Sequence, residues 1–263
     1  MVMRKIHRLC CGVLVLTTAL LTSCSEEYSI AGRTTIPMLD GQMLHLRTTA
    51  DDMTQMDIDS CMVVHGHFSF YGDVDTVRMA QVYLSHDFSM PIVIETGNLS
   101  IQVDNMGSRV TGSPMNDKLY KFFQKQAQLN NQLADLDAKF LKMANEGKTL
   151  DEIRAKLMPQ RKKILERAEK EEAKFIVENS DNILGPGYFM MMSSQFPTPV
   201  ITEGISRILD EVSPEFFNSP YVRNYIYQAS LNPLSAPVLK RADKNKKQGK
   251  KKRKRKETQD WQE

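Results

Sequence analysis

The sequence predicts an α+β protein: an N-terminal antiparallel β-sandwich or partly open barrel, then a helical domain with a long αα-hairpin, then a disordered basic C-terminal tail. Short apolar segments bounded by Gly, Asp or Pro predict the strands, and apolar residues at three- and four-residue steps predict the helices. A final run of Lys and Arg predicts the tail. The 263 residues allow one large or two small domains.

The composition excludes an integral transport protein. Hydrophobic residues make up 41% and charged residues 25% of the chain, which fits a folded soluble body. No internal apolar run approaches the roughly 20 residues that cross a bilayer. The expected segments are 1–23 (signal peptide), 24–27 (lipidated N-terminus and tether), 28–113 (β-rich module), 114–232 (helical region) and 233–263 (disordered basic tail).

Residues 1–23 predict a secretory signal, because a basic start precedes the apolar run 11–21. The end of this signal, Leu21-Thr22-Ser23-Cys24, resembles the bacterial lipobox, in which the peptidase cuts before the cysteine and the thiol receives a diacylglycerol. Cys24 is therefore the expected lipidation site, and each buried acyl methylene adds ~0.8 kcal/mol to membrane attachment. The expected location is the bacterial cell envelope. The sequence is compatible with both a periplasmic and a surface-facing orientation. An ordinary signal peptide with a chance cysteine is the alternative.

Cysteine usage argues against redox and zinc chemistry. The four cysteines are residues 10, 11, 24 and 61, and the first three fall in the N-terminal segment. Cys61 is thus the only thiol of the folded part, which leaves no internal disulfide, CxxC pair or thiolate zinc cluster. We expect no catalytic residue, no cofactor and no bound metal.

The first half of the chain reads as strands separated by turn signals. Segments 28–32 and 43–47 are expected strands on either side of the Asp40-Gly41 turn. His65-Gly66 lies between apolar-rich runs and predicts a two-residue hairpin turn. Further strands are expected at 77–84, 91–95 and 99–103, and their spacing indicates a single sandwich or barrel.

The second half of the chain reads as helices. One apolar face is expected to run from Leu119 to Met143, interrupted at Gln126, and Gly147 ends this helix. Thr149-Leu150-Asp151-Glu152 is a capping box that starts a second helix, so the two should form the hairpin. Pro159 is expected to kink or split the second helix. Its expected apolar positions are Leu150, Ile153, Leu157, Ile164, Ala168 and Phe175, and shorter helices are expected at 183–194, 201–212 and 214–228.

The charge is unevenly distributed. Residues 240–263 carry twelve Lys or Arg and four acids, for a net charge of +8, whereas residues 1–23 carry +3 and the remaining body −8. Outside the cytoplasm, the tail would meet anionic lipid headgroups, lipopolysaccharide or acidic glycans, and nucleic acid is not an expected partner. The expected polyanion-binding residues are Lys246, Lys247, Lys250, Lys251, Lys252, Arg253, Lys254, Arg255 and Lys256. A solubilising tail without a partner is the alternative.

A set of loose motifs carries a family resemblance when they are taken in order. They are Tyr28-x-Ile30-x-Gly32, Asp40-Gly41, Asp57-x-Asp59-Ser60, Gly66-x-Phe68-x-Phe70-x-Gly72, Pro91-x-x-x-Glu95-x-Gly97 and Val110-x-Gly112-Ser113-Pro114-x-Asn116. Residues 28 to 123 resemble the domain-of-unknown-function family 4369. The resemblance implies a β-rich module of Bacteroidetes lipoproteins, which commonly precedes a helical segment and a thioredoxin-like domain. After residue 238 this chain has its basic tail instead, without a WCxxC motif, so the resemblance implies no catalytic residue here.

Three side-chain clusters contain residue types that could form a chemical site. His65 and His67, near Cys61, would share one face of an extended strand and suit copper or zinc, but we interpret them as polar turn residues. The run 190–192 of methionines is expected to pack in the core, since consecutive helical side chains diverge by 100°. Glu169, Glu171 and Glu172, among Arg161, Lys162, Lys163, Arg167 and Lys170, are expected to form a solvated helix face.

Two functions remain open at this point. The favoured one is a non-enzymatic envelope lipoprotein that acts as a binding or scaffold module. Its expected partners are the membrane through the lipid anchor, an envelope protein, and an anionic lipid or glycan at the tail. The alternative is an accessory protein of a thiol-disulfide redox pathway that works with a separate thioredoxin-like protein.

Overall fold

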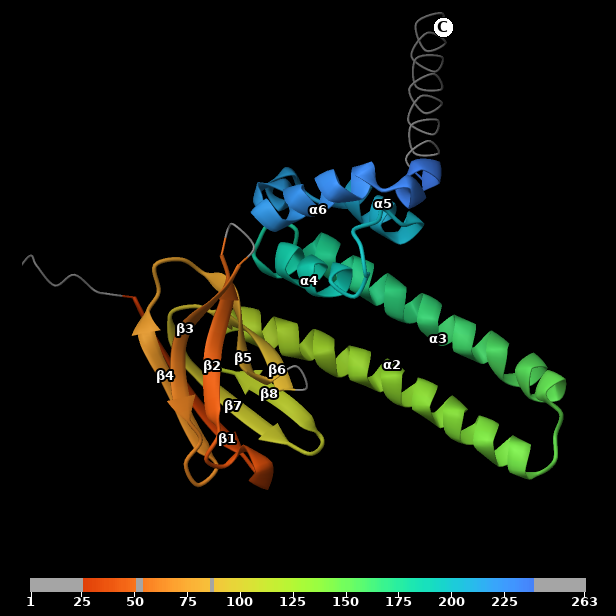
Figure 1. Cartoon of the computed structure of the whole chain (residues 1–263), viewed down its shortest axis with the longest axis horizontal. Coiled ribbons are helices and arrows are strands. Elements are labelled where there is room, and N and C mark those ends of the chain that lie inside the picture. The colour runs from red at the N-terminus through yellow and green to blue at the C-terminus, as the bar shows by residue number, and fades with distance from the viewer. Residues whose placement is uncertain (1–25, 51–53, 86–87, 239–263) are drawn as a thin grey trace, which may run out of the picture.

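The computed structural model describes residues 26–50, 54–85 and 88–238 (Figure 1). In these residues, eight strands form two four-stranded sheets, and the helices follow. The strands are β1 (Glu27–Thr34), β2 (Met43–Thr49), β3 (Gln55–Met62), β4 (His67–Asp73), β5 (Arg78–Ser85), β6 (Phe88–Ile94), β7 (Gly97–Asp104) and β8 (Gly107–Thr111), with the short 3₁₀ helix η1 (Pro37–Leu39) after β1. The predicted sandwich is confirmed.

The sheets differ from the prediction in one pairing. The first sheet has the order β4-β1-β7-β8 and the second the order β3-β2-β5-β6. All pairs are antiparallel except β1 with β7, which run parallel from Tyr28↔Gly97 to Thr34↔Val103. The predicted antiparallel sandwich therefore contains one parallel pair. Between these two strands the chain crosses to the second sheet for β2 and β3, returns for β4, and crosses again for β5 and β6, before β7 re-enters the first sheet in the same direction as β1.

The β3–β4 hairpin joins the two sheets and confirms the predicted turn. His65 and Gly66 have φ values of 51° and 74°, and Val64 pairs with His67 across the turn. Two successive positive φ values are typical of the type I′ turn, which matches the natural twist of a hairpin. Gly66 also lies against Thr34, because a Cβ atom there would be 2.6 Å from the Thr34 carbonyl oxygen.

One hydrophobic core extends from the sandwich into the helices. Alternate strand residues point inward, and Ile30, Leu44, Phe70 and Ile101 are fully buried. The same cluster includes Phe122 and other helical residues. The β-module and the base of the helical region therefore fold as one body, as the arrangement in Figure 1 shows.

The helical hairpin is confirmed and projects from this body (Figure 1). At 1.5 Å per residue, the 32 residues of its first helix extend about 48 Å. Gly147, with φ of 78°, ends the first helix, and Thr149 and Glu152 form the predicted capping box. The helices are α2 (Pro114–Asn145), α3 (Leu150–Glu178), α4 (Leu184–Ser193), α5 (Glu203–Glu211) and α6 (Pro220–Leu231), with the 3₁₀ helices η2 (Pro214–Asn218) and η3 (Pro233–Ser235).

Several helical details differ from the predictions. Of the two effects expected of Pro159, a kink or a split, the split does not occur: α3 continues through this exposed proline, whose missing N–H falls on the solvent side of the helix. The helix expected over 214–228 is two elements, since Ser219 before Pro220 is extended. Leu150 is 55% exposed at the hairpin tip, where α2 no longer covers it.

The folded part also extends into the segment that was expected to be tail. η3 lies within residues 233–238, and Ser235 is fully buried there. The Ser235 hydroxyl accepts a hydrogen bond of 2.8 Å from the N–H of Ile201, so this short segment is fixed to the body of the protein.

Candidate functional site

The predicted lipidation site and the predicted polyanion-binding residues lie outside the described residues. Cys24 precedes the first described residue, and residues 246–256 follow the last one. Both stay predictions. The sites that the structure does present are a pocket on the first sheet, a polar cluster on the second sheet, and the junction between the sandwich and α2.

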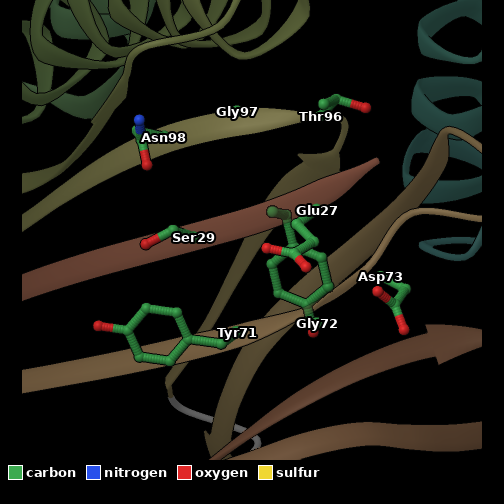
Figure 2. A pocket seen from close by; sticks show the side chains of 9 residues that line it. Glu27, Ser29, Tyr71, Gly72, Asp73, Thr96, Gly97 and Asn98 are labelled. Carbon is green, nitrogen blue, oxygen red and sulfur yellow. The ribbon is translucent and has the colours of Figure 1, made fainter. Parts of the chain in front are cut away.

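An open pocket of about 490 Å³ lies on the first sheet, where β1, β4 and the start of β7 meet (Figure 2). Glu27 and Asp73 face each other across the β1–β4 pair and supply carboxylates at one end, and Tyr71 lies toward the other. The remaining lining residues are Tyr28, Ser29, Gly72, Thr96, Gly97 and Asn98. Burial raises the pKa of Tyr28, and the nearby Asp59 and Asp73 raise it further, so this phenol stays protonated at neutral pH.

The outer face of the second sheet carries a polar cluster that the sequence did not predict. Asp57 pairs with Arg47, and its Oδ2 lies 3.0 Å from Nδ1 of His45, although that contact lacks hydrogen-bond alignment. The Arg47 guanidinium also stacks over the Tyr83 ring at 4.1 Å. Hydrogen bonding to Arg47 lowers the pKa of Asp57. The cluster links β2, β3 and β5 and reads as a structural network on a flat sheet face.

The cluster could not be seen in the sequence because a register shift creates it. Leu46 pairs with Asp59, whereas the next residue, Arg47, pairs with Asp57. The extra residue in β3 at this bulge brings one carboxylate within reach of both basic side chains of β2. Such a shift is set by long-range strand pairing and leaves no local signature.

Cys61 lies half-buried in β3, and burial raises the pKa of its thiol. The thiol is therefore protonated at neutral pH and is a weak nucleophile. We expect the purified protein to show no disulfide reductase activity, and Cys61→Ser to change stability only slightly. An insulin reduction assay and a denaturation curve of both proteins check this. A reductase activity that Cys61→Ser abolishes would contradict the prediction.

The structure also places the histidines and the methionines that the sequence offered as metal ligands. His65 lies in the turn with positive φ and His67 begins β4, so the two do not share one face of an extended strand. Met191 and Met192 pack against the core, as predicted, whereas Met190 is half-buried outside that cluster. Within residues 26–50, 54–85 and 88–238, no group of three or more His, Cys, Asp or Glu side chains is placed to hold a metal ion.

Glu172 departs from the expected solvated face. Its Oε1 accepts a hydrogen bond of 3.0 Å from the Tyr188 hydroxyl on α4, in a partly buried position. Burial raises the pKa of this carboxyl group. The neighbouring Glu171 instead accepts from Lys125 on α2 at 2.5 Å. The charged run therefore includes two residues that fix helix positions rather than only solvated side chains.

A buried amide, Asn116, bridges the sandwich and α2. Asn116, in the first turn of α2, accepts a hydrogen bond of 2.9 Å from the Val93 N–H and donates one of 2.7 Å to the Val93 carbonyl. Its amide also donates to the Ser113 hydroxyl at 2.8 Å. β6 is the edge strand of its sheet, and the Asn116 amide makes the two backbone hydrogen bonds that a neighbouring strand would make to Val93. The Tyr120 hydroxyl adds a bond to the Pro91 carbonyl at 3.0 Å.

The paired hydrogen bonds between Asn116 and Val93, here called the Asn116 clamp, lie inside the part of the chain that matches a protein family. Residues 28–119 match the family model described as Domain of unknown function (DUF4369). The DUF4369 match covers all the strands described above and ends just after Asn116, within α2. The comparison with curated proteins gave no match.

The DUF4369 match supports the resemblance seen in the sequence for the β-module alone. The long hairpin and the helices after it lie beyond the matched region. No helix of the described residues is both long and apolar enough to cross a membrane.

Proposed function

We propose that this protein is a non-enzymatic envelope lipoprotein that acts as a binding or scaffold module. The observation that carries the proposal is the firm mounting of the hairpin: α2, 32 residues long, bears the Asn116 clamp in its first turn and extends beyond the sandwich. A firmly mounted projection suits a protein that presents a surface at a fixed distance from its anchor.

The packing at the base of the hairpin supports the same function. The rings of Phe122 on α2 and Phe175 on α3 stack at 4.2 Å, and the Tyr188 ring of α4 meets Phe122 edge-on at 4.8 Å. Aromatic pairs of this kind restrict the relative orientation of the elements that carry them. The two helices therefore leave the body in one direction.

The redox accessory function is the second candidate. It rests on the modules that resemble residues 28–123 and precede thioredoxin-like domains. The raised pKa of the Cys61 thiol does not favour direct thiol exchange by this chain. In that role the protein would work only by binding a separate thioredoxin-like protein.

Attachment through Cys24 is tested by substitution. We expect Cys24→Ala to leave the precursor uncleaved by the lipoprotein peptidase and to abolish labelling with a fatty-acid analogue, because the thiol that receives the lipid is gone. Cys10→Ala and Cys11→Ala are matched controls that should keep full labelling. Labelling that persists in Cys24→Ala would remove the anchor from the proposal.

A further inference from the structure

Two rows of side chains line the open pocket on the first sheet, here called the first-sheet pocket. The strand register places Asn98 of β7, Ser29 of β1 and Tyr71 of β4 in one row, as Figure 2 shows. Glu27 and Asp73 form the second row, two residues away along β1 and β4. Both rows face outward, because the residues that alternate with them on β1 are buried in the core. The pocket therefore combines side chains from three neighbouring strands.

Four of these side chains carry polar groups that the described part of the protein does not use. Within residues 26–50, 54–85 and 88–238, the side chains of Ser29, Tyr71, Asp73 and Asn98 make no hydrogen bond and no ion pair. Ser29 is half-buried, and the other three are exposed. Their hydroxyl, carboxylate and amide groups are therefore available to a ligand in the pocket.

Tyr71 holds an exposed ring on a fixed backbone. The ring is 66% exposed, whereas the backbone lies opposite Ser29 of β1 and donates its N–H to Asp59 Oδ2 of β3 at 3.4 Å. A strand residue of this kind holds its aromatic face in place before a ligand arrives, which lowers the entropic cost of binding. Tyr71 therefore provides a flat apolar surface at one end of a polar pocket.

The charge and the hydrogen-bonding groups of the lining select the class of ligand. The carboxylates of Glu27 and Asp73 repel an anionic ligand. Carboxylates only accept hydrogen bonds, whereas the Ser29 hydroxyl and the Asn98 amide both donate and accept them. An ammonium ligand only donates, so it would pair with the carboxylates and leave the donor groups of Ser29 and Asn98 without a partner. Hydroxyl groups donate and accept, and a ligand that carries several of them matches the whole lining.

The exposed ring adds a second requirement, which is an apolar face on the same ligand. A pyranose sugar has C–H groups on the faces of its ring and hydroxyl groups around its edge. A sugar ring that stacks on Tyr71 would bring its hydroxyl groups next to Ser29 and Asn98, which occupy the same row. Because the pocket is open, it also admits a glycan chain that continues beyond it.

We propose that the first-sheet pocket binds a neutral saccharide, with one sugar ring stacked on Tyr71 and its hydroxyl groups bonded to Ser29, Asp73 and Asn98. The pocket is formed by β1, β4 and the start of β7, apart from the hairpin on which the scaffold function rests. The proposal therefore goes beyond that function and gives the β-module a ligand of its own.

The first experiment titrates the ¹⁵N-labelled chain from Ser25 to Glu263, which contains every described residue, with neutral oligosaccharides of glucose, mannose, galactose or xylose. Neutral probes are used because the basic tail would attract acidic ones. Two-dimensional NMR spectra report which backbone amides are affected by the probe. We expect one of the four sugar series to shift the amide signals of Ser29, Tyr71 and Asn98 and to leave those of the second sheet unchanged.

The second experiment measures the affinity of the same probe for substituted chains. Tyr71→Ala is expected to weaken binding about tenfold or more, because it removes the stacking surface, whereas Tyr71→Phe keeps the ring and should bind within about twofold of the original. Asn98→Ala removes an exposed amide and should weaken binding about threefold or more. Tyr227→Ala is the matched control and should leave the affinity unchanged, since Tyr227 is 61% exposed on α6 and lies outside the pocket.

Three results would overturn the proposal. The first is that none of the four sugar series shifts the spectrum at millimolar concentration. The second is that the shifted signals lie on other elements, or that Tyr71→Ala binds the probe as tightly as the original chain. The third is that Nα-acetyl-lysine amide shifts the pocket signals and no saccharide does, which would identify a cation site. All three are measured on the unlipidated chain, so they are independent of the attachment tested at Cys24.

Discussion

Asn116→Ala is expected to lower the free energy of unfolding by about 2 to 5 kcal/mol, because it leaves the N–H and the carbonyl of Val93 buried without partners. The loss of the bond to Ser113 adds to this effect. Chemical denaturation followed by circular dichroism measures the change. A loss of this size would show that the Asn116 amide is a major contact between the sandwich and α2.

Asn131→Ala is the matched control for this variant. Asn131 lies exposed on the same helix, so its replacement should change the unfolding free energy by less than about 0.5 kcal/mol. If Asn116→Ala costs no more than Asn131→Ala, the clamp does not hold α2 to the sheet, and the rigid mounting in the proposed function fails.

Deleting residues 240–256 is expected to reduce binding to anionic vesicles on the order of a thousandfold or more. Each Lys or Arg close to an anionic surface contributes about 1 kcal/mol, and the deleted segment contains all twelve basic residues of the tail. The acidic residues of the β-module are repelled by the same anionic surface, so they cannot substitute for the deleted basic tail. Vesicle sedimentation with the unlipidated chain at two salt concentrations measures the effect, and binding should weaken steeply as salt rises, because the Debye length is ~8 Å in physiological salt.

Deleting residues 257–263 is the control, since this segment contains three acids and no Lys or Arg. It should leave vesicle binding unchanged or slightly stronger. Binding that is insensitive to salt, or equal with and without residues 240–256, would leave the tail as a solubilising segment. Weak binding by the full chain itself would indicate that the tail folds back onto the acidic body.

The features that the sequence predicts well are local ones. The His65-Gly66 turn and the Thr149–Glu152 capping box each depend on a few adjacent residues, and the structure confirms both. The apolar face of α2 is similarly local, because helical periodicity places Leu119, Phe122 and Leu129 on one side.

The features that the sequence does not reveal depend on distant segments. The parallel pairing of β1 with β7 and the bulge that assembles the Asp57 cluster follow from strand order and register. Asn116 is visible in the family motif, but its partner Val93 is brought to it only by the folded sheet. The candidate pocket likewise combines residues from β1, β4 and β7, which adjacent sequence cannot bring together.

The clamp at Asn116 has a mechanical consequence for the whole molecule. Because α2 extends about 44 Å from Asn116 to its end, a rotation of about 5° at the base displaces the hairpin tip by about 4 Å. Such a displacement approaches the rise of one helical turn, about 5.4 Å. A pull or push on the tip is correspondingly delivered as torque to the base of α2, where the Asn116 amide, the Tyr120 hydroxyl and the buried side chains of Leu119 and Phe122 resist it.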